Sequence, residues 1–249
     1  MSRVHKLILG HSVSPRHSRT ALKNQVYTVL RIWRNYDHHD FGIERIVRLS
    51  LASAQFLSFG LYIKHFLFRA GSTWRKLAIE LYVICKMITP LLALYFGWIK
   101  FNWFIYLTIY FLLETLIHVT ATIFISDASR ENVQPKRSLV LLFLNFFQIA
   151  FDFALMYAFY EMRITDFFTR DLKGSVDAIY FSFVTAATVG YGDIAPVASL
   201  AKKLAIAQIS LTFVFVGLFL NFFANLLQRA QNVDTTTNSK KTRHTKRKG

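Results

Sequence analysis

The chain of 249 residues is poor in cysteine, in acidic residues and in charge as a whole. Cys85 is its only cysteine, so an intrachain disulfide is excluded and the redox compartment cannot be inferred. Charged residues make up 18% of the chain, and 14 acids oppose 30 Lys and Arg, which gives a net charge of +16. No pairing of a nucleophile with a base is apparent, so the sequence does not indicate an enzyme.

Two kinds of targeting or sensing segment are also missing. The only apolar patch near the N-terminus, residues 7–10, is too short for a signal peptide, so we expect insertion to rely on the first transmembrane helix. No apolar stretch carries arginines at every third position, as a voltage sensor requires. About 22 polar residues follow the last apolar stretch, so we expect no C-terminal sensory domain.

Long apolar stretches are abundant, and hydrophobic residues make up 53% of the chain. Four stretches approach or exceed 20 residues: 77–98, 103–125, 138–160 and 199–227. About 20 apolar residues cross the ~30 Å hydrocarbon core of a bilayer, whereas a soluble core shows shorter amphipathic pieces. The sequence therefore predicts an all-α membrane protein with four transmembrane helices.

The placement of the basic residues predicts the topology. Four spans put both termini on one side, and most Lys and Arg then lie on that side, which we take as cytoplasmic. Six basic residues lie outside: Lys100, Arg163, Arg170, Lys173, Lys202 and Lys203. The basic N-terminal region and the tail 228–249 favour contact with anionic lipid over nucleic acid. We expect the tail to be disordered and the protein to lie in the plasma membrane.

The segment 43–68 is ambiguous. Its apolar part, residues 49–63, is interrupted by polar residues and is short for a span, and basic residues lie on both sides. We interpret it as an amphipathic helix at the cytoplasmic interface, within a basic region over 1–76. A cluster at Asp37, His38, His39 and Asp40 is weak as a metal site and favours a solvated turn.

A short motif between the last two spans is the most specific signal in the chain. Residues 188–193 read Thr-Val-Gly-Tyr-Gly-Asp. They follow a short apolar stretch, residues 178–184, which begins after Ser175 and Asp177, residues suited to a helix N-terminus. Gly190 and Gly192 can adopt backbone angles that turn successive carbonyls toward one axis. Non-helical backbone at membrane depth requires a water-lined or protein-buried role, which makes an ordinary turn a poor alternative.

On this motif the chain resembles the potassium-channel family, whose selectivity filter has the same six residues. The resemblance covers about 138–227 and implies a pore domain of outer helix, re-entrant pore helix, filter loop and inner helix. It implies a single-pore subunit of the bacterial type, with two additional helices over 77–126, in a homotetramer. K⁺ would be the permeant ion, with no cofactor.

The resemblance also implies residue roles. The carbonyls of Thr188, Val189, Gly190 and Tyr191 would coordinate K⁺, and the Val189 and Tyr191 side chains would pack away from the path. The other residues expected to support the filter are Gly192, Asp193, Tyr180, Val184 and Thr185. Val184 stands where some bacterial members carry a glutamate that pairs with the filter aspartate, so we expect Tyr180 to be the partner of Asp193.

The last span is the expected inner helix. Phe213, Val216, Leu220 and Ala224 follow one helical stripe that could line a cavity, although packing or lipid contact is equally compatible with each. Thr212 stands near the usual position of a hinge glycine, and Gly217 follows five residues later. Asn221 could line the gate or hydrogen-bond between helices.

Ionisable residues inside the spans are functional candidates. Lys86 and Glu114 lie at similar depth in antiparallel helices, so we predict an ion pair. Glu80 and His118 could pair nearer the cytoplasmic face. His118 invites a proton-sensing hypothesis, but helix-to-helix attachment is favoured. In the third span, Asn145, Gln148 and Asp152 share one face, which we expect to turn toward protein.

The sequence thus predicts a potassium-selective channel subunit that conducts passively. The alternatives are a weakly selective cation channel and a non-conducting regulatory subunit. The gating stimulus is not predicted.

Overall fold

The computed structural model describes residues 20–34, 42–68, 72–125 and 135–245. Within these ranges the regular structure is helical, apart from one isolated bridge between Phe168 and Pro196. The predicted all-α fold is therefore confirmed. The cluster at 37–40 lies outside the described residues. The elements are α2 (Ala21–Arg34), α3 (Gly42–Ala54), η1 (Gln55–Leu57), α4 (Phe59–Phe66), α5 (Ser72–Tyr95), η2 (Trp98–Lys100), α6 (Asn102–Phe124), α7 (Pro135–Glu161), α8 (Ser175–Ala186) and α9 (Ser199–Thr245).

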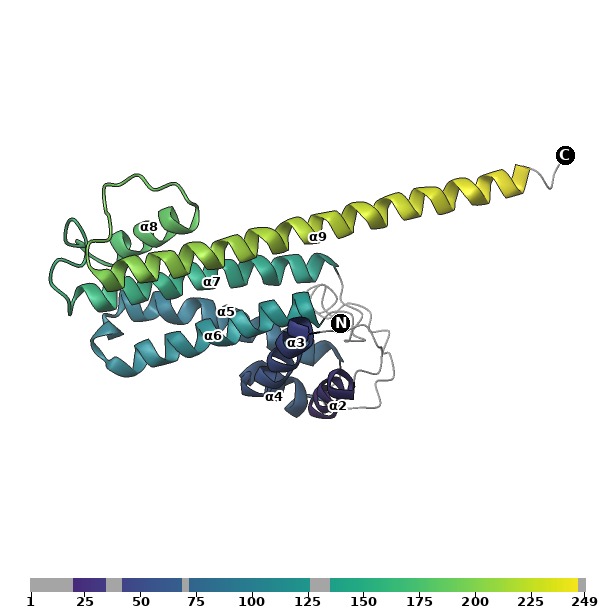
Figure 1. Ribbon diagram of the computed structural model, residues 1–249, viewed down its shortest axis with the longest axis horizontal. Helices are drawn as coiled ribbons and strands as arrows, with labels where there is room; N and C mark the ends of the chain where they lie inside the picture. The colour runs from purple at the N-terminus through teal and green to yellow at the C-terminus, as the bar shows by residue number, and fades with distance from the viewer. Residues whose placement is uncertain (1–19, 35–41, 69–71, 126–134, 246–249) are drawn as a thin grey trace, which may run out of the picture.

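Four of these helices are long and apolar enough to cross a membrane, as predicted. The spans are Trp74–Tyr95, Asn102–Ala121, Leu139–Glu161 and Ser199–Ala224, in α5, α6, α7 and α9. Figure 1 shows the four helices running along one direction, with α8 beside one end of α9. At 12 residues, α8 is too short to span.

Helix α7 is the centre of the bundle and contacts α5, α6, α8 and α9. Its side chains Phe153, Leu155 and Tyr157 are at most 1% exposed, as are Phe167 in the following loop and Phe215 of α9. These large side chains form one continuous core. The position of α8 is therefore determined by the same packing that joins α7 to its neighbours.

The two ends of the bundle are defined by different contacts. At one end Gly97 adopts φ +67° between α5 and α6, a left-handed conformation that favours glycine. At this end the Ser175 Oγ, in the first turn of α8, donates to the Leu94 carbonyl near the end of α5. At the opposite end Ile125, just after α6, packs with Ile32 of α2 and Ala52 of α3.

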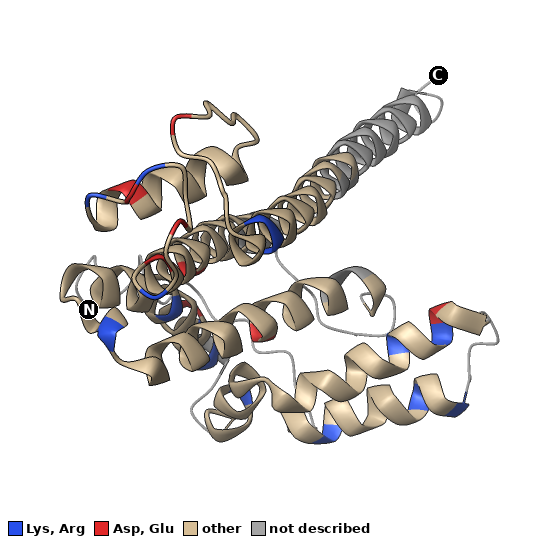
Figure 2. Cartoon of the chain, turned by 60° about the vertical axis from the view of Figure 1, so that its left-hand side comes forward, with Lys and Arg blue, Asp and Glu red and all other residues tan. Residues whose placement is uncertain are grey.

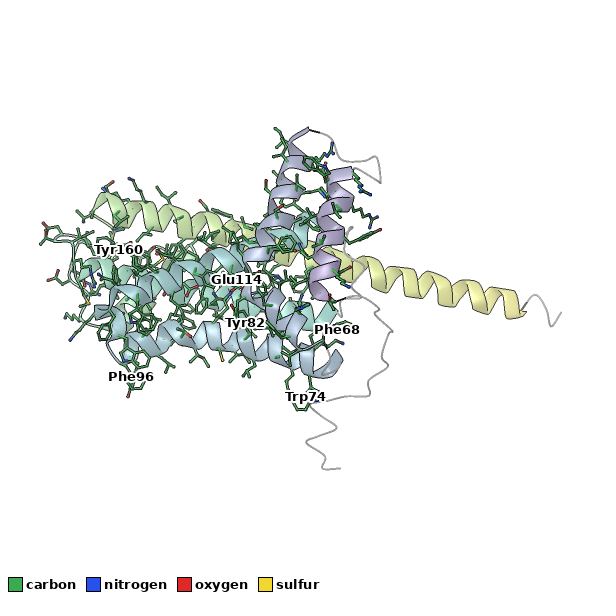
Figure 3. All side chains as sticks on the ribbon, turned by 90° about the horizontal axis from the view of Figure 1, so that it is seen from below. Phe68, Trp74, Tyr82, Phe96, Glu114 and Tyr160 are labelled. Carbon is green, nitrogen blue, oxygen red and sulfur yellow. The ribbon has the colours of Figure 1, made fainter. Side chains whose placement is uncertain are left out.

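The segment 43–68 is not one helix. Helices α3 and η1 (Gly42–Leu57) and α4 (Phe59–Phe66) are separated by a break at Ser58 with a bend of 64°. The prediction of a single amphipathic helix is therefore wrong, and its interfacial location stays a prediction. Figures 1 and 3 show α2 and α3 running across the direction of the four long helices.

The prediction of a disordered tail is wrong for 228–245, because α9 continues from the last span to Thr245. These residues include no glycine or proline. A helix already formed in the span therefore meets no helix breaker along the tail.

Candidate functional site

The site is built on the start of α8. Asp177 lies in the first turn of this helix, and its Oδ2 accepts hydrogen bonds from the Lys173 backbone N–H and the Arg170 guanidinium, each at 3.0 Å. The Lys173 hydrogen bond, followed by Arg170, lowers the pKa of Asp177 below its usual range. The carboxylate therefore stays ionised at neutral pH, close to a helix N-terminus that favours negative charge.

The non-helical segment 188–193 that follows α8, which we call the strand, has an unusual backbone. Thr188, Gly190 and Gly192 have φ values of +55°, +61° and +80°, so every second residue is left-handed. In an ordinary extended strand successive carbonyls point to opposite sides, and reversing the hand at alternate residues turns them toward the same side. The arrangement can present a row of backbone oxygens. Glycine adopts such angles at little cost.

Thr188 was not predicted to take a left-handed conformation. A non-glycine residue with this backbone costs about 1–2 kcal/mol, and surrounding contacts must hold it. Here the Thr188 N–H donates to the Thr185 carbonyl and the Val189 N–H to the Val184 carbonyl, both at 3.0 Å. Val184 and Thr185, near the end of α8, therefore hold the start of the strand through their backbone carbonyls.

Two side chains of the strand, Tyr191 and Asp193, contact Tyr180 of α8. The rings of Tyr180 and Tyr191 are parallel, with centroids 6.5 Å apart. Desolvation and a hydrogen bond to Asp193 raise the pKa of Tyr180, so its hydroxyl stays protonated and can donate to the carboxylate. Val189 and Tyr191 are 50% and 70% exposed in the single chain.

Arg170 also contacts Asp193, a partner that the sequence reasoning missed. Its guanidinium lies 3.9 Å from Asp193 Oδ2 and 3.0 Å from Asp177 Oδ2. Arg170 therefore bridges the start of α8 and the end of the strand. We call these three residues (Arg170, Asp177, Asp193) the mouth cluster. Nothing in the sequence position of Arg170, in a polar loop that also holds Arg163 and Lys173, indicates this contact.

A buried set of hydrogen bonds behind α8 was also missed. The Tyr157 hydroxyl donates to Gln208 Oε1 at 2.8 Å, and Gln208 Nε2 donates to the Ser182 Oγ and carbonyl at 2.8 and 2.9 Å. The Ser182 Oγ donates to the Ala150 carbonyl at 2.6 Å. All three side chains are at most 1% exposed. They join α7, α8 and α9.

The predicted stripe on α9 is exposed in the single chain. Phe213, Val216 and Leu220 are 64%, 47% and 66% exposed, and Ala224 is exposed as well. Thr212 is instead buried, and its hydroxyl donates to the Gln208 carbonyl. Helix α9 continues without interruption through Gly217, and the Asn221 side chain lies outside the described residues. The exposed stripe is available for a cavity or for other subunits.

The predicted ion pair between Lys86 and Glu114 is present. Lys86 Nζ lies 3.2 Å from Glu114 Oε2, with both side chains at most 5% exposed. Lys86 also donates to the Thr115 hydroxyl at 2.7 Å, and the Tyr82 hydroxyl donates to Glu114. Figure 3 shows Tyr82 and Glu114 close together on neighbouring helices of the bundle. These groups form the buried cluster (Tyr82, Lys86, Glu114, Thr115).

Hydrogen bonds extend the buried cluster to α7. The Thr115 hydroxyl donates to Gln148 Oε1 at 3.1 Å, and Gln148 Nε2 donates to Asp152 Oδ2 at 3.0 Å. Gln148 and Asp152 are fully buried, and Asn145 is 7% exposed. The expectation that this face of the third span turns toward protein is confirmed.

The Glu114 carboxylate also accepts hydrogen bonds from residues at the break before α4. Glu114 Oε1 accepts from the Ser58 hydroxyl at 2.7 Å and the Gly60 N–H at 3.1 Å, and the Phe59 N–H donates to the Tyr110 hydroxyl. The first N–H groups of a helix have no partner within it. Side chains of α6 thus satisfy the donors freed by the break.

Glu80 and His118 are less buried than the Lys86–Glu114 pair. His118 is exposed on α6 although Glu114, one turn earlier, is buried. Their proposed pairing, and proton sensing by His118, stay predictions.

The comparisons with known proteins concern the part of the chain that carries this geometry. Residues 139–229 match the model of a family described as "Ion channel". That family is one of channels and not of enzymes. The match covers α8, the strand and both spans that flank them. It supports a membrane channel protein with a potassium-channel type of pore fold.

Plant proteins are similar over part of the chain. It is 40% identical to two-pore potassium channel 4 of Arabidopsis thaliana over 78 residues, 29% of this chain and 28% of that protein. It is 44% identical to two pore potassium channel b of Oryza sativa subsp. japonica over 57 residues, 23% and 16% of the two chains. Two-pore potassium channel 1 of Arabidopsis thaliana is 45% identical over 59 residues, 24% and 16%. The chain thus covers less than a third of these relatives, and no solved structure matches it detectably.

Proposed function

We propose that this chain is a subunit of a potassium-selective channel and that the carbonyls of Thr188, Val189, Gly190 and Tyr191 line the ion path. The observation that carries the proposal is the alternation of left-handed residues along this strand, within the segment that matches the ion-channel family. Backbone oxygens can replace the water around a cation without full negative charge, so that the ion can enter and leave.

The proposed assembly is a homotetramer. One strand offers oxygens from one side only, and a closed ring around a cation needs several copies. The sequence holds one such motif, and the relatives are named for two pores. We therefore propose that four copies supply four strands around a symmetry axis. The exposed stripe of α9 would then face the central cavity.

The proposed organisation follows from this assembly. Residues 138–227 form the pore domain, 77–126 form a two-helix transmembrane domain, and 1–76 and 228–249 are basic cytoplasmic regions. The bundle end with α8 faces outside, and both termini face the cytoplasm of a cell whose plasma membrane holds the channel. The basic regions meet anionic lipid, and no nucleic acid or cofactor is involved.

Flux through proteoliposomes tests the function. The full chain is reconstituted, and the reversal potential is measured with K⁺ on one side and Na⁺ on the other, while light scattering gives the mass of the purified complex. A tetramer whose reversal potential follows K⁺ supports the proposal. Equal K⁺ and Na⁺ permeability would indicate a weakly selective cation channel, and a tetramer without flux would indicate a regulatory subunit.

A further inference from the structure

One side of α2 is both apolar and exposed. Val26, Tyr27, Leu30 and Trp33 are 46%, 45%, 45% and 62% exposed. With 3.6 residues per turn, these positions fall on a single face of the helix. An apolar face of this kind on a fixed helix needs a partner that is itself apolar.

The opposite side of α2 is attached to the bundle. Thr28 and Ile32 are buried, and Gln25 Nε2 donates to the Ala52 carbonyl of α3 at 2.8 Å. Ile32 packs with Ala52 and with Ile125, which follows α6. The exposed face is thus held at the end of the bundle opposite to α8.

The charges on α2 indicate an anionic partner. Lys23 and Arg34 are exposed and lie on the same face as the four apolar residues, near the two ends of the helix. Helix α2 contains no acidic residue. Figure 2 shows Lys and Arg in blue along α2 and α3.

We propose that this face of α2 binds the cytoplasmic surface of the bilayer. The helix crosses the direction of the spans (Figures 1 and 3), as a helix lying in the plane of the membrane does. Val26, Tyr27, Leu30 and Trp33 enter the boundary between headgroups and acyl chains, while Lys23 and Arg34 meet lipid phosphates. The inference uses the topology of the proposed function but not its ion selectivity.

Spin labels test the location of the face. In a Cys85→Ser background, Leu30→Cys and Trp33→Cys are labelled in the full chain in phosphatidylcholine–phosphatidylglycerol liposomes, with Lys202→Cys as an exposed reference from the other end. Collisions with O₂, which concentrates in lipid, and with a water-soluble Ni²⁺ chelate are compared. We expect an O₂-to-Ni²⁺ collision ratio several-fold above that of Lys202→Cys. A ratio equal to the reference places the face in water, and protection from both reagents places it against another protein surface; either result overturns the proposal.

The charge contribution is tested in the same liposomes. Removing phosphatidylglycerol, or introducing Lys23→Gln with Arg34→Gln, is expected to lower the ratio at residue 30 by the same factor. The matched control is Lys202→Gln with Lys203→Gln, two exposed bases at the other end of the bundle. If the ratio stays the same after both changes, Lys23 and Arg34 do not contribute to lipid binding. Because the readout needs no ion flux, a chain that fails to conduct still tests this inference.

Discussion

The two polar sites of this chain are built in opposite ways. The strand 188–193 is exposed on the single chain, and its form rests on a backbone in which alternate residues are left-handed. The buried cluster uses the charged side chains of Lys86 and Glu114, which are removed from solvent between α5 and α6 and are joined to α7 by a hydrogen bond. The geometry of a backbone site depends on the φ and ψ angles, so it tolerates few substitutions. The stability of a buried charge depends instead on the presence of its partner. The first type suits a passing ion, and the second suits attachment between helices.

Gly190→Ala should have the largest effect on function. A Cβ at Gly190 meets nothing within 4 Å in the single chain, but φ is +61°, so alanine costs about 1–2 kcal/mol and shifts the carbonyls. We expect K⁺ flux in liposomes to be lost. Gly42→Ala is the matched control, because φ is +57° and nothing lies within 4 Å there either. Retained flux in Gly190→Ala would refute the role of this strand.

Lys86→Met should have the largest effect on stability. Removing the ammonium leaves the Glu114 carboxylate buried without its counter-charge, which costs about 3–5 kcal/mol. Unfolding in detergent, followed by circular dichroism, measures the loss. The double variant Lys86→Met/Glu114→Gln should recover part of it. If the two substitutions simply add, the pair does not couple these helices.

Gln208→Leu should have an intermediate effect. Tyr157 and Ser182 would each lose a buried hydrogen-bond partner, at about 1–3 kcal/mol for an unsatisfied group. Ser210→Ala serves as the control, because the exposed Ser210 donates only to a carbonyl of its own helix. Equal unfolding curves for Gln208→Leu and the control would show that these hydrogen bonds between α7, α8 and α9 contribute no stability.

Arg170→Gln should have the smallest effect on stability, since exposed ion pairs contribute about 0–1 kcal/mol. A carboxyl with a lowered folded pKa contributes stability above its unfolded pKa, and this is lost as pH falls through the folded pKa. Without Arg170 the pKa of Asp177 should rise only part of the way toward its usual value, because the hydrogen bond from the Lys173 N–H, the main cause of the lowered pKa, remains. The pH-dependent loss of stability should therefore be smaller in Arg170→Gln and should be complete at a higher acidic pH. Carboxyl-carbon NMR of Asp177 measures the shift, and Arg170→Lys should retain most of the wild-type value. An unchanged pKa in Arg170→Gln would contradict the contact.

The features that could be predicted from sequence were those encoded locally. Apolar length predicted the four spans, and the motif at 188–193 placed the strand. Lys86 and Glu114 were paired because two antiparallel helices joined by a short turn bring equal depths together. Periodicity alone also predicted that Asn145, Gln148 and Asp152 face protein.

The features that were missed depend on tertiary contacts. The break at Ser58 has no proline, and it is accommodated by a carboxylate 56 residues away. Gln208 and Ser182 meet only after three helices pack, and Arg170 reaches Asp193 from a loop without regular structure. The left-handed Thr188 follows from hydrogen bonds at the end of α8, and no residue preference indicates it.

Pro90 lies between two attachment points of α5: Lys86, bonded to α6, and Leu94, whose carbonyl is bonded to Ser175 at the start of α8. Proline has no N–H, so the Lys86 carbonyl, four residues earlier, loses its helical hydrogen bond. The helix is mechanically weakest at this missing rung. We therefore expect a tilt of the part of α5 before Pro90 to be taken up as bending at this position before it reaches Leu94 and the start of α8.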